Sequence, residues 1–68
     1  MGKTKQIVGE RIRALRNGQG LTQEQLGMMV GLNRVQISRL ETGSMNTSLD
    51  NLDKVLDGLG CSIDELFR

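Results

Sequence analysis

The fold is decided by residues 23–40, which read QEQLGMMVGLNRVQISRL. Two short helical stretches stand here with almost no loop between them, so the two helices can only cross at a steep angle. Such a crossing needs a small residue where the helices approach each other, which Gly27 provides, and a residue tolerant of positive φ at the turn, which Gly31 provides. The stretch therefore predicts a helix, a tight glycine turn and a second helix packed across the first.

The apolar residues of this stretch predict which faces of the two helices are buried. The first helix carries Leu26, Met29 and Val30 at helical spacing, and the second carries Ile37 and Leu40. The outer face of the second helix is left with two arginines among small and polar side chains: Arg34, Val35, Gln36, Ser38 and Arg39. Because the positive end of the helix dipole lies at the start of this helix, the face is suited to a negatively charged partner.

The rest of the chain predicts further helices and no sheet. No stretch alternates apolar and polar residues with period two, and β-branched Val and Ile are few. Side chains that can cap a helix precede four of the periodic segments: Thr22, Asn33, Ser48 and Ser62. The segment after Ser48 has the longest apolar stripe, made of Leu49, Leu52, Val55, Leu56 and Leu59. We therefore expect one compact, all-α, five-helix domain over residues 1–68, with helices at about 5–17, 23–30, 34–42, 49–59 and 63–67.

The composition excludes most catalytic chemistry. The chain has no His and one Cys, Cys61, so it cannot form a Cys–His dyad, a Ser-His-Asp triad, a Cys/His zinc site or an intramolecular disulfide. The aspartates at positions 50, 53 and 57 are interpreted as a solvated helix face and not as a metal site. We expect no enzyme, no metal and no cofactor. Cys61 is interpreted as a small buried hydrophobe, with a reactive thiol as the alternative.

The chain shows no sign of a membrane location. No apolar run approaches the ~20 residues that span a bilayer, and the first residues lead into an amphipathic segment that does not resemble a secretory signal. A single thiol is typical of the reducing cytoplasm. We therefore expect a cytoplasmic protein without a membrane or small-molecule ligand.

The charges divide the chain into a basic and an acidic half. Residues 1–39 hold seven Lys and Arg against two Glu, a net charge of +5, and residues 40–68 hold two against six, a net charge of −4. A basic face attracts polyanions such as nucleic acids. Charge alone leaves open the alternative of a solvated surface without a partner.

The motifs of the chain resemble a known family. The similarity covers residues 6–67 and is carried by GLTQEQLG at residues 20–27, GLN at 31–33, ISRLETG at 37–43, LGCSIDELF at 59–67 and Arg16. In this register the sequence resembles the Cro/C1-type helix-turn-helix domain, also called XRE or lambda-repressor-like. Phage repressors of this kind are standard examples of helix-turn-helix docking, in which the second helix of the motif lies in the DNA major groove.

The resemblance implies a role for several residues. The helix Arg34–Thr42 would be the recognition helix, with base contacts from Arg34, Val35, Gln36 and Arg39. Gln23 matches the phosphate-clamping position of the family, and further phosphate contacts are expected from Asn33, Ser38, Thr42, Ser44 and Asn46. Arg16 and Glu41 match positions that form a structural ion pair in relatives of this fold.

Two interpretations of the function are compatible with the sequence. The first is a transcriptional regulator, and more specifically a repressor, that binds a palindromic operator in double-stranded DNA as a homodimer. The alternative is a protein-interaction module that holds a partner such as a toxin or another regulator, with secondary DNA binding, and the acidic second half favours it. The apolar residues near the C-terminus either complete the core or form a dimer surface: Leu59, Cys61, Ile63 and Phe67.

Overall fold

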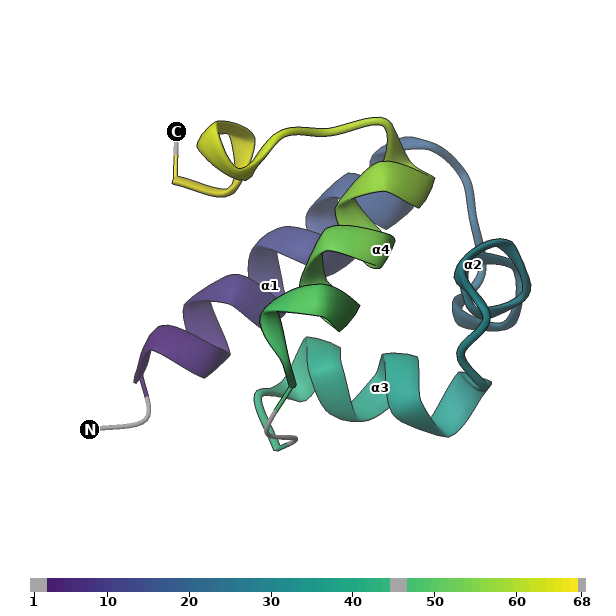
Figure 1. Cartoon of the computed structure of the whole chain (residues 1–68), viewed down its shortest axis with the longest axis horizontal. Helices are drawn as coiled ribbons and strands as arrows, with labels where there is room; N and C mark the ends of the chain where they lie inside the picture. The colour runs from purple at the N-terminus through teal and green to yellow at the C-terminus, as the bar shows by residue number, and fades with distance from the viewer. Residues whose placement is uncertain (1–2, 45–46, 68) are drawn as a thin grey trace.

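The computed structural model describes residues 3–44 and 47–67, and within them it forms four α-helices followed by a short 3₁₀-helix (Figure 1). In chain order these elements are α1 (Lys3–Gly18), α2 (Gln23–Val30), α3 (Arg34–Thr42), α4 (Leu49–Leu59) and the 3₁₀-helix η1 (Ile63–Phe67). The all-helical fold class is confirmed, and α1 begins two residues earlier than expected.

The expectation of a fifth α-helix is wrong. The segment after Ser62 is a 3₁₀-helix of 5 residues, in which the backbone N–H of Glu65 donates to the carbonyl of Ser62 at 3.1 Å. This bond links residues three apart. So short a segment cannot offset the cost of nucleating an α-helix, and 3₁₀ bonding is common in such short pieces.

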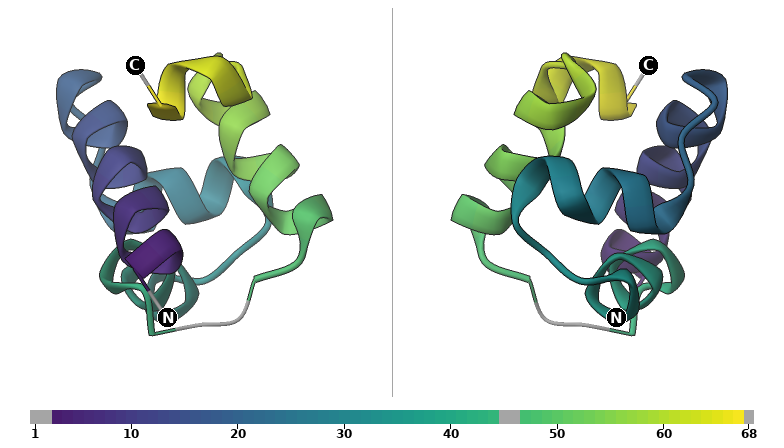
Figure 2. Two further views of the ribbon diagram at one scale, coloured as in Figure 1. Left: turned by 90° about the vertical axis from the view of Figure 1, so that its left-hand side faces the viewer. Right: turned by 90° about the vertical axis from the view of Figure 1, so that its right-hand side faces the viewer.

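The helices enclose one core. Seen from the side, α1 and α4 flank the core, α3 lies end-on at one end and η1 closes the other end (Figure 2). Helix α1 packs against α3, α4 and η1, whereas α2 packs against α3 and α4. The fully enclosed apolar residues come from all five elements: Ile12, Leu26, Ile37, Leu40, Val55, Leu56, Leu59 and Leu66.

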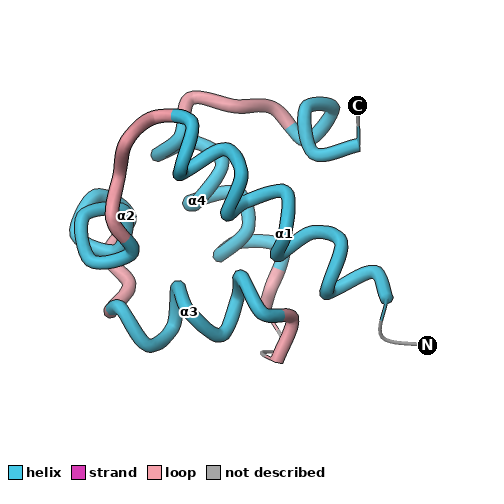
Figure 3. Tube along the Cα trace, turned by 180° about the vertical axis from the view of Figure 1, so that it is seen from behind, coloured by secondary structure: helices cyan, strands magenta, loops and turns pink. Residues whose placement is uncertain are grey.

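The helix-turn-helix pair crosses steeply, as the sequence predicts. Figure 3 shows α2 nearly end-on while α3 runs across the view, with a short loop between them. Gly31 ends α2 with a φ of 77°, in the left-handed region that favours glycine. A Cβ at Gly27 would overlap the carbonyl oxygen of Leu32. The small residue is therefore needed by the turn that leads into α3.

Two apolar residues predicted to be buried are exposed. Met29 is 53% exposed because the buried side of α2 lies between Leu26 and Gly27, and at ~100° per residue Met29 is roughly a third of a turn away. Leu49 is 80% exposed. It lies in the first turn of α4, where burial decreases from Leu56 through the half-buried Leu52, so this turn extends beyond the core.

Candidate nucleic-acid interface

The start of α3 is fixed by a reciprocal cap. The Asn33 side-chain oxygen accepts from the backbone N–H of Gln36 at 2.8 Å, and the Gln36 side-chain oxygen accepts from the backbone N–H of Asn33 at 2.9 Å. Both side chains are thus engaged in holding the helix start. Any contact that they make to a ligand uses their remaining amide N–H groups.

Helix α3 lies along one edge of the molecule (Figure 1). Arg34, Val35 and Arg39 are exposed, and Ser38 is half-buried between them. Together with Gln23 at the start of α2, these four residues line a hollow of about 240 Å³. The structure therefore brings together two guanidinium groups, an amide, a hydroxyl and two methyl groups on one surface.

This mixture of groups suits a DNA surface. A guanidinium donates two parallel hydrogen bonds to guanine O6 and N7 or to a phosphate, and an aliphatic side chain packs against the thymine methyl group. Val35 is 52% exposed and lies one helical turn before Arg39, on the same face. The hollow thus has donors for base edges next to an apolar contact.

Below the hollow, a buried ion pair joins α1 to α3. Arg16 Nε donates to Glu41 Oε2 at 2.6 Å, and Arg16 Nη2 donates to Glu41 Oε1 at 3.0 Å. Arg16 Nη1 also donates to the carbonyl of Leu21 at 2.7 Å. The side chains are 9% and 1% exposed, and the hydrogen bonds to Glu41 raise the pKa of Arg16 above its ordinary value. The fully hydrogen-bonded pair therefore connects α1 with α3 beneath the candidate interface.

Close approach of the backbones makes this pair possible. A Cβ at Gly9 of α1 would lie 2.5 Å from the carbonyl oxygens of both Leu40 and Glu41, which is closer than real Cβ atoms come to such atoms. Gly9 therefore lets α1 pack directly on the end of α3. Gly9 could not be singled out from the sequence, because a single glycine inside a helical pattern carries no sign of what lies opposite it.

Gln23 belongs to the same network. Its side-chain Nε2 donates to Glu41 Oε1 at 3.1 Å, so the half-buried amide connects the hollow with the ion pair. This contact is not predicted by the sequence pattern. The family resemblance gives Gln23 and Glu41 separate roles and does not indicate that the two side chains meet.

The remaining phosphate candidates lie at the end of α3. Thr42 Oγ1 lies 3.1 Å from the carbonyl of Ser38 and 2.9 Å from Ser44 Oγ, so both hydroxyls are engaged locally. Asn46 lies outside the described residues. Neither Thr42 nor Ser44 lines the hollow, so the structure does not gather all the predicted phosphate contacts at one place.

The predicted dimer residues occupy different environments. Leu59 belongs to the core at 4% exposure, whereas Ile63 is 50% exposed. Cys61 is half-buried, its thiol donates to the carbonyl of Leu59 at 3.4 Å, and burial together with nearby Glu65 raises its pKa. The side chain of Phe67 lies outside the described part. Among the three residues whose side chains the structure describes, Ile63 is the most exposed.

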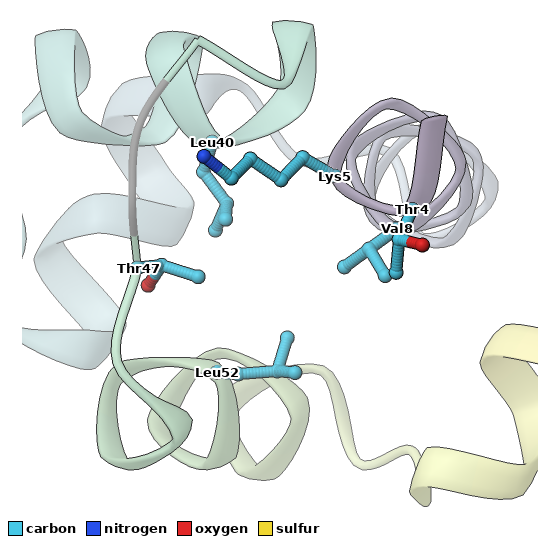
Figure 4. A pocket seen from close by; sticks show the side chains of 6 residues that line it. All are labelled: Thr4, Lys5, Val8, Leu40, Thr47 and Leu52. Carbon is cyan, nitrogen blue, oxygen red and sulfur yellow. The ribbon is translucent and has the colours of Figure 1, made fainter. Parts of the chain in front are cut away.

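A second hollow lies on another side of the molecule. It has a volume of about 150 Å³ and lies between the start of α1, the end of α3 and the start of α4. Figure 4 shows Val8, Leu40 and Leu52 around this space, with Thr4, Lys5 and Thr47 at its margin. Its lining is mainly apolar and has no group of convergent polar side chains, so it is a gap in packing.

Metal-binding clusters and membrane-spanning helices are absent from the residues that the structure describes. Over residues 3–44 and 47–67 no three Cys, Asp or Glu side chains gather closely enough to hold a metal ion. In the same ranges, no helix has the length and apolar character needed to cross a bilayer.

Comparison with known proteins identifies the family. The sequence profile of the helix-turn-helix family HTH_3 matches residues 12–66. The control protein C.MunI of Mycoplasma sp is 38% identical over 60 residues, which are 87% of this chain and 81% of that protein. Repressor protein C2 of Salmonella phage P22 is 40% identical over 63 residues, which cover 93% of this chain but only 29% of the repressor.

A solved structure supports the same assignment. The restriction-modification controller protein C.AhdI from Aeromonas hydrophila superimposes with a TM-score of 0.91 at 36% sequence identity, covering 97% of this chain and 96% of that one. The resemblance to Cro/C1-type domains is thereby confirmed over nearly the whole length. The chain belongs to the HTH_3 helix-turn-helix family of DNA-binding transcriptional regulators, which are not enzymes.

Proposed function

We propose that this chain is a sequence-specific repressor that binds a palindromic operator in double-stranded DNA as a homodimer, with α3 in the major groove. The observation that carries the proposal is the hollow on α3, where Arg34, Val35 and Arg39 are exposed side by side on a capped helix. Repression is the proposed mode because relatives named as repressors share this domain. Acting on DNA, such a regulator works in the cytoplasm.

Base readout is assigned to three exposed residues of α3. Arg34 and Arg39 have guanidinium groups that match the two acceptors of guanine, and Val35 matches a thymine methyl. Gln36 has a free amide N–H for an adenine or a phosphate, since its oxygen is occupied by the helix cap. The expected half-site therefore contains guanines beside a thymine.

Phosphate contacts are assigned to the ends of the motif. Gln23 lies at the N-terminus of α2, where the helix dipole and unpaired backbone N–H groups favour an anion. Asn33, Ser38, Thr42, Ser44 and Asn46 complete the proposed set. Such contacts hold the protein on any duplex, whereas the base contacts select the operator.

Dimerisation is proposed through the end of the molecule that η1 closes, opposite α3 (Figure 2). Ile63 is 50% exposed there, and Cys61 beside it is half-buried. A twofold dimer of a helix-turn-helix protein binds two half-sites about one helical turn of DNA apart. A palindromic operator follows from this symmetry.

Selection of bound sites from random duplexes tests the proposal, followed by anisotropy titrations on the selected operator. Arg34→Ala and Arg39→Ala are each expected to weaken operator binding by about 1–3 kcal/mol and to relax base preference. Arg13→Ala, an exposed arginine of α1, is the control for lost charge. Unchanged operator affinity in both α3 variants would refute the base readout.

The same experiment tests symmetry and the class of partner. A selected site with twofold symmetry, together with a dimer in sedimentation, supports the homodimer. Affinity should fall steeply between about 50 and 200 mM salt, because phosphate contacts release counterions. Failure to select any site would instead favour the protein-interaction module.

A further inference from the structure

We propose that Glu41 is a positioning residue for DNA binding, because its carboxylate holds the side-chain amide of Gln23 with one N–H toward Glu41, so that the second N–H of the same nitrogen remains for a phosphate. This inference rests on the proposed function, since it concerns how Gln23 meets the DNA. It assigns a part in binding to a residue that is itself 4% exposed and out of reach of any ligand.

Glu41 can only accept hydrogen bonds from its neighbours. Both of its oxygens already take hydrogen bonds from Arg16, at 2.6 Å to Oε2 and 3.0 Å to Oε1. An ionised carboxylate paired with a guanidinium is an acceptor only. A third group at hydrogen-bond distance must therefore be a donor.

The carboxylate of Glu41 selects the flip of the Gln23 amide. An amide side chain has two ends of opposite character, and its two flips differ in which end faces a neighbour. With Glu41 Oε1 at 3.1 Å, the NH₂ end must face the carboxylate. The reverse flip would bring two oxygen atoms that both lack a hydrogen to the same distance, so it is disfavoured.

The second N–H of the Gln23 amide remains available for a ligand. One N–H of Gln23 is taken by Glu41, and the second N–H of the same nitrogen stays available on the residue that lines the hollow with Arg34 and Arg39. A phosphate oxygen needs such a donor. An amide that rotates freely would have to lose its rotational freedom on binding, whereas the held amide has already lost it.

The ion pair also balances the negative charge of Glu41. A lone carboxylate this close to the hollow would repel phosphate, but Arg16 binds both of its oxygens and balances its charge. Arg16 itself is anchored by a further bond to the carbonyl of Leu21, at the entry to α2. The network therefore supports Gln23 without adding net negative charge to the DNA face.

A double-mutant cycle on a random-sequence duplex tests this role. In the wild-type background, Gln23→Ala is expected to weaken binding by about tenfold, the size of one good hydrogen bond. In the Glu41→Gln background, the same change should cost only about fivefold, because an amide at position 41 pairs with either flip of Gln23 and leaves about half of the molecules in the competent flip. Glu24→Gln is the matched control, since it removes an exposed negative charge from the next residue of α2 and should keep the full cost.

The outcomes separate this inference from the proposed function. An equal cost of Gln23→Ala in all three backgrounds overturns the positioning role and leaves DNA binding intact. No cost in the wild-type background overturns both the phosphate contact of Gln23 and the role of Glu41. A cost that is roughly halved only with Glu41→Gln supports the inference.

Nuclear magnetic resonance of the wild-type chain gives a second test if Glu41→Gln does not fold. One of the two side-chain amide protons of Gln23 should be shifted downfield by its bond to the carboxylate, and the other should shift when a random duplex is added. Ordinary, unshifted signals for both protons would overturn the proposal without any variant.

Discussion

Arg16→Met should be severely destabilising, because it leaves a buried carboxylate without its partner. Arg16 makes three hydrogen bonds, at 2.6 and 3.0 Å to Glu41 and at 2.7 Å to the carbonyl of Leu21. After the change, Glu41 would keep only its contact with Gln23 at 3.1 Å. Breaking one side of a buried pair costs about 3–5 kcal/mol.

This cost is large against the stability available. At ~0.05–0.15 kcal/mol per residue, a domain of 68 residues has a free energy of unfolding of roughly 3–10 kcal/mol. Loss of the arginine therefore removes about a third of the stability or more. The measurement is urea unfolding followed by far-UV circular dichroism, in which the midpoint should fall by several molar, at a slope of about 1 kcal/mol per molar.

Two further variants make the reasoning refutable. Arg13→Met removes the same charge from an exposed position of α1 and should change stability by no more than about 0.5 kcal/mol. The double variant Arg16→Met/Glu41→Leu should recover most of the loss, since apolar pairs often replace buried ion pairs without cost. A loss below about 1 kcal/mol for Arg16→Met, or no recovery in the double variant, would show that the carboxylate is not an uncompensated charge.

Three further changes have expected results. Gly9→Ala should lower the free energy of unfolding by about 1–3 kcal/mol in urea titrations, because its Cβ would meet two backbone carbonyls of α3 at 2.5 Å. Val8→Leu should raise the free energy of unfolding by up to about 1 kcal/mol in the same titrations, as its added methylene enters the apolar hollow. The Cys61 thiol should react with a disulfide reagent more slowly in the folded chain than in urea at about pH 8, because its pKa is raised, and Glu65→Gln should speed the folded reaction.

The local signals were enough to predict the helix-turn-helix. The helix caps predicted at Thr22 and Asn33 are confirmed. Each of these side chains accepts a hydrogen bond from the backbone N–H three residues later, and the side chain of that later residue accepts one from the backbone N–H of the capping residue. Both depend only on residues close in sequence, as does the positive φ of Gly31. Information of this short range is fully contained in the sequence pattern.

The predictions are wrong where burial depends on packing between segments that are distant in the sequence. Met29 and Leu49 have the helical spacing of buried residues, yet both are exposed. The elements that pack against α2 and α4 do not extend far enough to cover these two side chains. The last segment has a capping residue and apolar positions, but it is too short for an α-helix. Periodicity states which residues share a face, and it does not state how far the opposing surface extends.

The contact between Glu41 and Gln23 is a reason for burying a charged pair at this position of the fold. An apolar pair at Arg16 and Glu41 would hold α1 on α3 at least as well, but it would offer nothing to Gln23. If the carboxylate positions that amide, the double variant Arg16→Met/Glu41→Leu should fold and still bind a random duplex about as weakly as Gln23→Ala does. A folded double variant with wild-type affinity would mean that the buried charge serves the fold alone.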